Sequence, residues 1–243
     1  MMARRMPGKR GCRNLVLCGI VLATLTGCTQ AIASRSVYHD PLTSIRLQED
    51  DRTDEAHSHP GRLTTEEMAA VLRGLRVVSR QGILGSLVMG VDQGRPAFSS
   101  VEIQDLAPQL VRALEQATPH EIVTFYRRFS DAGVGLAVTS GGLFLHHRHL
   151  YVIVANNRTL PSAALSQSIV TEIDPIDNPL LPISRTDFRL LFEPAMAILP
   201  TDERRPWPYI DDGRLVAIDL LQLARASRLG TGDVLHENEP TAR

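Results

Sequence analysis

Residues 133–157 read GVGLAVTSGGLFLHHRHLYVIVANN, and their apolar residues follow a period of two. That period is typical of β-strands, whereas the segments before it repeat every three to four residues. Two strands are predicted, at about 134–146 and 149–156, paired as a hairpin. Thr139-Ser140-Gly141-Gly142 interrupts the alternation and predicts a bulge or local bend in the first strand. The stretch therefore indicates an antiparallel sheet.

Further strand signals follow toward the C-terminus. FRLLFEPAMAIL at 188–199 predicts a strand that Pro194 breaks or places at an edge. In YIDDGRLVAI at 209–218, Asp212-Gly213 lies between two apolar runs, which predicts a type I′ hairpin. DLLQLARASRL at 219–229 predicts a short last helix, and the polar residues 230–243 predict a disordered tail.

Helix start signals precede the hairpin. Thr64 with Glu67, and Ser99 with Glu102, have the spacing of capping boxes, and Gly74 is expected to end the first helix before a strand in LRVVSR. Thr118 with Pro119 predicts a third helix start. The buried face of this third helix is expected to contain Ile122, Phe125, Tyr126 and Phe129.

This order of elements indicates the fold class. We expect one α+β domain over residues 63–229, with an antiparallel sheet and helices packed on one face. An antiparallel sheet needs only one buried face, which fits the alternation better than a parallel sheet does.

The first residues have the features of a leader. A basic region with Arg4, Arg5 and Lys9 precedes the apolar run at 15–25. That run is about half the length of a transmembrane helix, so a secretory signal peptide is predicted over residues 1–27. It ends in Leu25-Thr26-Gly27-Cys28.

This ending resembles the lipobox of bacterial lipoproteins, and the resemblance covers residues 1–28 only. It implies cleavage before Cys28, a diacylglycerol on the Cys28 thiol, and attachment to a membrane of the cell envelope. Thr29 follows Cys28. In a Gram-negative host the resemblance then implies the periplasmic face of the outer membrane rather than the inner membrane. The alternative is an ordinary cleaved signal with an incidental cysteine.

Residues 28–62 are predicted to be the lipidated cysteine followed by a flexible tether, because they are polar and carry no apolar period. A tether of this length would reach roughly 30 Å on average. The alternative is an N-terminal arm that packs on the domain.

Composition excludes several kinds of chemistry. Cys12, Cys18 and the single lysine, Lys9, would leave with the leader, so the mature chain could form neither a disulfide nor a Schiff base. Without the five leader cations, 21 of the 26 Lys and Arg remain against 27 Asp and Glu, a formal charge of about −6. That balance argues against nucleic acid as a partner.

Four groups of residues are candidates for function. His146 and His149 flank the hairpin turn and are weak candidates for a metal site. Ser140 is a candidate nucleophile, although Val138 breaks the Gly-x-Ser-x-Gly pattern. The aspartates at 174, 177, 187, 211 and 212 could supply paired carboxylates. Trp207 with Arg204 and Arg205 has the composition of a protein-contact surface.

No spacing here matches a known catalytic motif, so we expect no cofactor and favour a non-enzymatic binding module. Its partners would be the membrane, through the lipid, and an envelope protein that it contacts. An envelope hydrolase with a scattered active site and a metal-binding periplasmic domain are the alternatives.

Overall fold

The computed structural model describes residues 34–79, 94–131, 135–160, 176–183, 188–200, 203–204 and 213–236. They belong to one compact unit, Ala33–Arg243. The predicted signal peptide and Cys28 lie outside the described residues.

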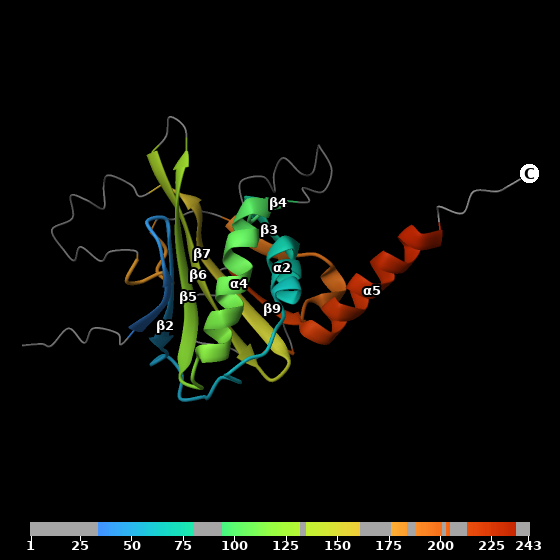
Figure 1. Cartoon of the computed structure of the whole chain (residues 1–243), viewed down its shortest axis with the longest axis horizontal. Helices are drawn as coiled ribbons and strands as arrows, with labels where there is room; N and C mark the ends of the chain where they lie inside the picture. The colour runs from blue at the N-terminus through green and yellow to red at the C-terminus, as the bar shows by residue number, and fades with distance from the viewer. Residues whose placement is uncertain are drawn as a thin grey trace, which may run out of the picture. The chain divides into compact units, whose positions relative to one another are not determined.

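A six-stranded antiparallel sheet forms the centre of the domain (Figure 1). Its order is β1 (Ser34–His39), β2 (Thr43–Glu49), β5 (Glu121–Asp131), β6 (Gly135–His146), β7 (His149–Thr159) and β9 (Leu215–Asp219). β6 and β7 form the predicted hairpin, with His146 opposite His149. The register shifts twice between Val138 and Gly141, which confirms the predicted irregularity.

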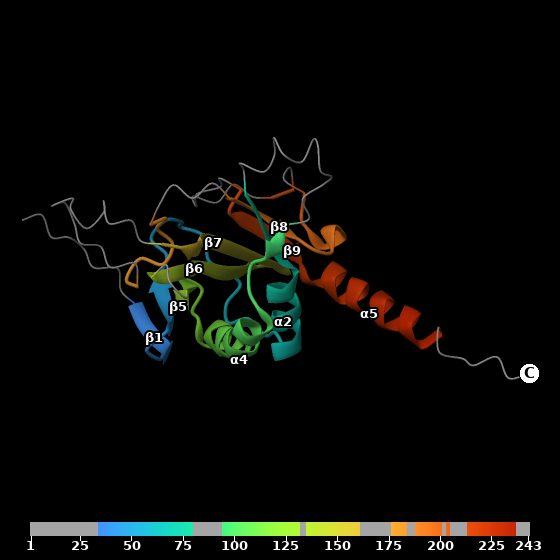
Figure 2. The same ribbon diagram turned by 90° about the horizontal axis from the view of Figure 1, so that it is seen from above.

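Two helices cover one face of this sheet, as Figures 1 and 2 show. α2 (Thr65–Gly74) and α4 (Ser100–Gln116) begin at the predicted capping boxes of Thr64 and Ser99. We call the covered side the helix face, and the α+β prediction with helices on one face is confirmed. Its buried strand residues include Ile45, Leu47, Val123, Phe125, Leu143, Val152 and Val216.

A second, three-stranded sheet contributes to the same core. Its order is β4 (Arg95–Pro96), β3 (Leu75–Ser79) and β8 (Phe188–Phe192). The strand predicted at 188–199 therefore ends at Phe192, and a 3-10 turn, η2 (Ala195–Ala197), follows Pro194. The weak strand predicted at 86–91 lies outside the described residues.

Irregular segments cover the other face of the six-stranded sheet, which we call the loop face. Residues 176–183 and Leu199 pack there. The strand residues beneath them include Ile122, Tyr126, Phe144, Tyr151, Ile153, Leu215 and Ala217. Both faces of the sheet are thus buried, but only one of them is buried by helices.

The tether prediction is wrong for residues 34–62. β1 and β2 join the sheet, with β2 paired along its length with β5. Residues 50–61, which we call the strap, then cross the end of the domain. Their backbone N–H groups donate to His120 O at 2.8 Å, Pro119 O at 2.7 Å and Leu114 O at 2.9 Å. The domain therefore includes residues 34–62, upstream of the predicted boundary at residue 63.

The third predicted helix is also wrong, because residues 121–131 form β5. Its start signal is present in part, since the Thr118 N–H donates to Glu121 Oε2 at 2.8 Å. However, β5 pairs with β2 on one side and β6 on the other, so its backbone groups bond across the sheet. A strand buried on both faces shows no simple alternation, and its apolar spacing then resembles that of a helix.

The last helix, α5 (Leu220–His236), is longer than predicted, so the disordered tail is wrong for residues 230–236. α5 follows β9 directly, and its far part extends away from the sheet in Figures 1 and 2. The pairing partner of β9 is β7. Gly213 has the positive φ of 78° expected of a turn glycine, but residues 209–212 of the predicted hairpin lie outside the described residues.

Candidate interaction groove

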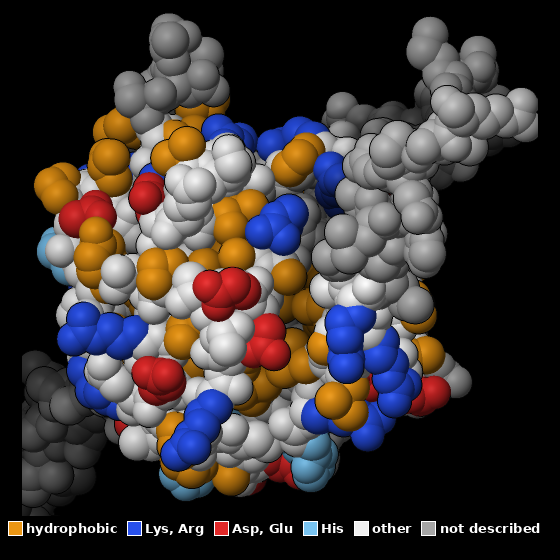
Figure 3. Space-filling model, turned by 45° about the vertical axis from the view of Figure 1, so that its right-hand side comes forward, with side chains coloured by type: hydrophobic (Ala, Val, Ile, Leu, Met, Phe, Trp, Pro, Cys, Tyr) orange, Lys and Arg blue, Asp and Glu red, His pale blue; other side chains and the backbone are white. Residues whose placement is uncertain are grey.

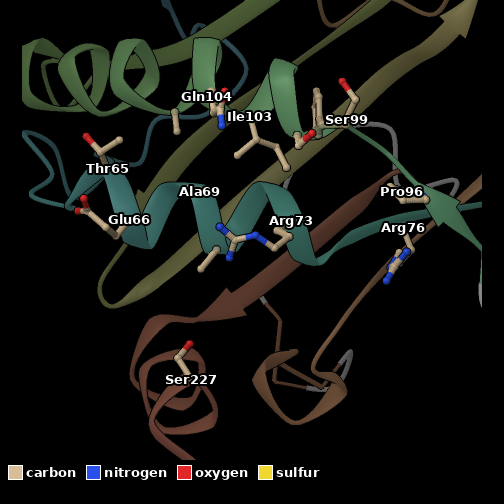
Figure 4. A pocket seen from close by; sticks show the side chains of 14 residues that line it. Thr65, Glu66, Ala69, Arg73, Arg76, Pro96, Ser99, Ile103, Gln104 and Ser227 are labelled. Carbon is tan, nitrogen blue, oxygen red and sulfur yellow. The ribbon is translucent and has the colours of Figure 1, made fainter. Parts of the chain in front are cut away.

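The outer side of the helix layer contains a groove of about 780 Å³ between α2 and α4. Figure 4 shows the side chains that line it, with Ala69 on α2 and Ile103 on α4. The floor is apolar and consists of Ala69, Ala70, Pro96, Phe98, Ile103 and Ala107. The rim is polar and consists of Thr65, Glu66, Arg73, Arg76, Ser99, Ser100, Gln104 and Ser227.

Capping interactions fix the two helices that form the groove. The Glu67 N–H donates to Thr64 Oγ1 at 3.1 Å, and the Thr64 N–H donates to Glu67 Oε2 at 2.8 Å. Ser99 and Glu102 form the same reciprocal pair at the start of α4. Because each box satisfies two backbone donors, the first turns of both helices are held in place.

Glu102 also ties α4 to the sheet. Its carboxylate is buried and accepts two hydrogen bonds from Arg158 Nη2, at 3.1 and 3.2 Å. Arg158 follows Asn157, whose Nδ2 donates to Ala97 O at 3.1 Å. The end of β7 therefore positions the beginning of α4 and one end of the groove.

The described lining of the groove consists of apolar, hydroxyl, amide and guanidinium groups and one carboxylate. Among these 14 described residues none is His, Cys or Asp, and the single carboxylate, Glu66, is exposed. Within that described lining the hydroxyl groups on the rim have no imidazole beside them, and a hydroxyl nucleophile usually requires such a base. Figure 3 shows apolar side chains between separate acidic and basic ones on the side turned toward the viewer.

Ser140, the candidate nucleophile, is part of a polar cluster in the core. Its Oγ donates to Pro179 O at 2.7 Å and accepts from Asn156 Nδ2 at 2.8 Å. Asn156 Nδ2 also donates to Leu181 O at 2.9 Å, and Asn156 Oδ1 accepts from the Ile183 N–H at 2.8 Å. Ser140 and Asn156 are fully buried, so the cluster fastens residues 179–183 to the loop face and is not placed for nucleophilic attack.

His57 and His59, which lie within the predicted tether, are buried in the strap. His57 Nε2 lies 2.9 Å from Asp50 Oδ2, and both side chains are inaccessible. The ring of His59 lies 5.7 Å from that of His57, edge to face. Burial, with a smaller effect of His57, lowers the pKa of His59 to about 4.

The candidate metal ligands His146 and His149 lie opposite each other at the hairpin end. The His146 ring contacts those of His147 and Tyr151, and His149 Nε2 lies 3.9 Å from Asp219 Oδ2. Burial lowers the pKa of His149. Within the described ranges, no group of three or more His, Cys, Asp or Glu is placed to hold a metal ion.

The candidate contact surface around Trp207 is described only at Arg204. Arg204 Nε donates to Leu199 O at 2.8 Å, so this side chain contacts the backbone of its own domain. Trp207 and Arg205 lie outside the described residues. Of the candidate aspartates, Asp177 is described and pairs with Arg46 at 2.7 Å, whereas the other four lie outside the described residues.

Sequence reasoning missed the groove and the pair Asn156 and Asn157. The polar run Asn156-Asn157-Arg158 at the end of an apolar strand was the available signal, since polar groups inside a core require partners. No local sequence pattern indicated the groove, because the groove forms only where α2 and α4 pack side by side.

Among the described residues, no helix has both the length and the apolar character needed to cross a membrane. No family model, curated protein or solved structure matches the chain.

Proposed function

We propose that this chain is a lipid-anchored protein of the cell envelope whose domain acts by binding and not by catalysis. The anchor is proposed from the sequence, in which a basic region and a short apolar run end at Leu25-Thr26-Gly27-Cys28. In a Gram-negative host, Thr29 favours the periplasmic face of the outer membrane. A protein in that place would meet envelope proteins and lipid, but not nucleic acid.

The start of β1 limits how far such an anchor would let the domain move. β1 begins at Ser34, so only residues 29–33 separate Cys28 from the sheet. Six Cα-to-Cα steps span at most about 20 Å. A lipid on Cys28 would therefore hold the domain close to the membrane surface, not at the end of a long tether.

The groove between α2 and α4 is the observation that supports binding. It combines an apolar floor with a polar rim, which is the usual composition of a recognition site. The described residues that line it include no His, Cys or Asp that would pair with its hydroxyl groups. A partner would bury the alanines of the floor and form hydrogen bonds with the rim.

Fractionation of a Cys28→Ser variant tests the anchor. We expect the wild-type chain to be processed and to float with membranes, and the variant to remain unprocessed. Cys18→Ser is the matched control, because it removes a cysteine from the same leader and should be processed normally. Normal processing and membrane retention of the Cys28→Ser variant would refute the anchor.

A further inference from the structure

The exposed side of α2 carries two opposite charges in a self-complementary arrangement. Glu66 and Arg73 are seven residues apart, which is two helical turns, so they lie on the same face about 10 Å apart. Ala69 and Ala70 lie midway between them on the floor of the groove. Figure 4 shows Glu66 and Arg73 on either side of Ala69.

Both charges are available to a partner. Glu66 and Arg73 are exposed. The capping box of α2 uses Glu67 instead of Glu66, and Arg76 pairs with Glu193 at 2.9 Å. In the part of the chain that the structure describes, neither Glu66 nor Arg73 forms a salt bridge.

A second α2 in the opposite direction satisfies this pattern. With a two-fold axis between residues 69 and 70, Glu66 of each copy lies opposite Arg73 of the other, and Ala69 lies opposite Ala70. A two-fold interface requires such reciprocal pairs. Two alanines at the crossing point allow the helix axes to approach near the lower end of the usual 8–10 Å.

We propose that the groove is occupied by α2 of a second copy of this chain, antiparallel to the first, with Glu66 and Arg73 paired across the interface. This inference rests on the proposed function, in which the groove is the binding site. Ile103 and Ala107, the α4 residues on the floor of the groove, face the incoming helix.

The size of the surface predicts a weak dimer. α2 has ten residues and is about 15 Å long, so a contact limited to α2 and α4 falls at or below the lower end of stable interfaces, about 1,000 Å². Chains held on one membrane surface have a raised effective concentration, which favours such an interface. We therefore expect the dimer to be most populated in the anchored protein at high surface density, and to form in solution at high concentration.

Sedimentation equilibrium of the full chain in density-matched detergent, over a wide concentration range, measures this association. We expect the wild type to dimerise and Glu66→Arg or Arg73→Glu alone to raise the dimer Kd at least tenfold. Each single change places like charges together twice across the two-fold axis. The double variant exchanges both charges and should return the Kd to within about threefold of the wild-type value. Arg112→Glu, an equal charge change on α4 away from the groove, should leave it within about twofold.

A second pair of variants changes no charge, whereas Glu66→Arg and Arg73→Glu also oppose the helix dipole of α2. Ala70→Trp fills the floor of the groove and should give monomers, whereas Val101→Trp, on exposed α4 surface outside it, should still dimerise. The thermal unfolding midpoint of each variant confirms that it is folded.

A wild-type chain that stays monomeric at the highest concentration, or a double variant that is not restored, would overturn the inference. These outcomes are separate from a failure of the anchor. A chain without lipid that still shows the charge rescue would keep the dimer and refute the anchor. A lipidated chain that is monomeric at every concentration would support the anchor and refute the dimer.

Discussion

The two faces of the six-stranded sheet are buried by different means. On the helix face, α2 and α4 satisfy their own backbone groups and cover the strands with apolar side chains. On the loop face, residues 176–183 are irregular, so their N–H and C=O groups need partners from elsewhere. Ser140 and Asn156 supply those partners from inside the sheet. The helices therefore need polar ties to the sheet where α4 begins, at Glu102 and Ala97, whereas the irregular cover needs buried polar partners along its own backbone.

Two adjacent asparagines of β7, Asn156 and Asn157, show the same difference between the two faces within one strand. Asn156 forms three hydrogen bonds on the loop face, to Ser140, Leu181 and Ile183. Asn157 forms one side-chain bond, to Ala97 O beside the start of α4. An asparagine side chain thus forms more hydrogen bonds on the face that irregular segments cover than on the face that helices cover.

The largest expected effect comes from the two glycines of β6. A Cβ at Gly141 would lie 2.0 Å from Ile153 O and 2.9 Å from Phe125 Cζ, on the helix face. A Cβ at Gly142 would lie 2.8 Å from Leu180 Cδ2, a side chain on the loop face. We expect Gly141→Ala to lower the free energy of unfolding by about 4 kcal/mol or to prevent folding, because the contacting atom is backbone.

Gly142→Ala is the matched variant, and we expect it to cost about half as much, since Leu180 can adjust. Urea denaturation of both variants measures the difference. Equal losses would show that Leu180 is held as rigidly as the β7 backbone at Ile153, which would contradict an adjustable cover on the loop face.

The next largest effect is a difference in stability between the Asn156→Ala and Asn157→Ala variants. Asn156→Ala leaves a buried N–H and a buried C=O without partners, and we expect a loss of about 3 kcal/mol in the free energy of unfolding. Asn157→Ala removes one bond and should cost about 1 kcal/mol. Denaturant unfolding of both variants measures these losses. A larger loss of unfolding free energy for Asn157→Ala than for Asn156→Ala would contradict the greater need for polar partners on the loop face.

A third prediction concerns the strap and acid. The pKa of His59 is about 4 in the folded protein and about 6.5 in the unfolded chain, so the unfolded chain takes up the proton first. The stabilising contribution of neutral His59 is complete above pH 6.5 and is lost as the pH falls toward 4. Its full size is at most about 3 kcal/mol.

His59→Asn should therefore flatten the decline in stability between pH 6.5 and 4.5 relative to wild type. His147→Asn is the control, because His147 is exposed at the turn, where its φ of 54° is tolerated by asparagine. A decline that His59→Asn leaves unchanged would show that His59 is not the group responsible.

The smallest effect is at a helix cap. Thr64→Ala removes the acceptor of the Glu67 N–H and should lower the free energy of unfolding by about 1 kcal/mol. Thr64→Ser keeps that acceptor and should change it by less than about half as much. A cap with no measurable effect would mean that packing alone fixes the start of α2.

Regular local signals were sufficient for part of the fold. The capping boxes at Thr64 and Ser99 and the alternation in β6 and β7 predicted elements that the structure contains. Local signals failed where a distant partner decides the structure. Residues 121–131 have a helix-like start signal but lie between β2 and β6, and the polar β1 becomes a strand only because β2 is beside it.

The candidate site was harder to predict for the same reason. The sequence singles out Ser140 through its glycine neighbours, yet the structural role of Ser140 comes from Asn156 and Pro179, which are distant in sequence. Glu66 and Arg73 look like ordinary surface charges until α4 is placed beside α2. Residues 34–62 look like a tether because the strap meets its partners at 114–120 through backbone groups, which leave no pattern in the side chains.

Intact-mass and N-terminal peptide mass spectrometry of the protein extracted from membranes will show whether Cys28 carries the lipid. We expect a mature chain that begins at residue 28 and carries a diacylglycerol on the Cys28 sulfur. An unmodified Cys28, or an N-terminus that lies elsewhere in the chain, would refute the lipid anchor.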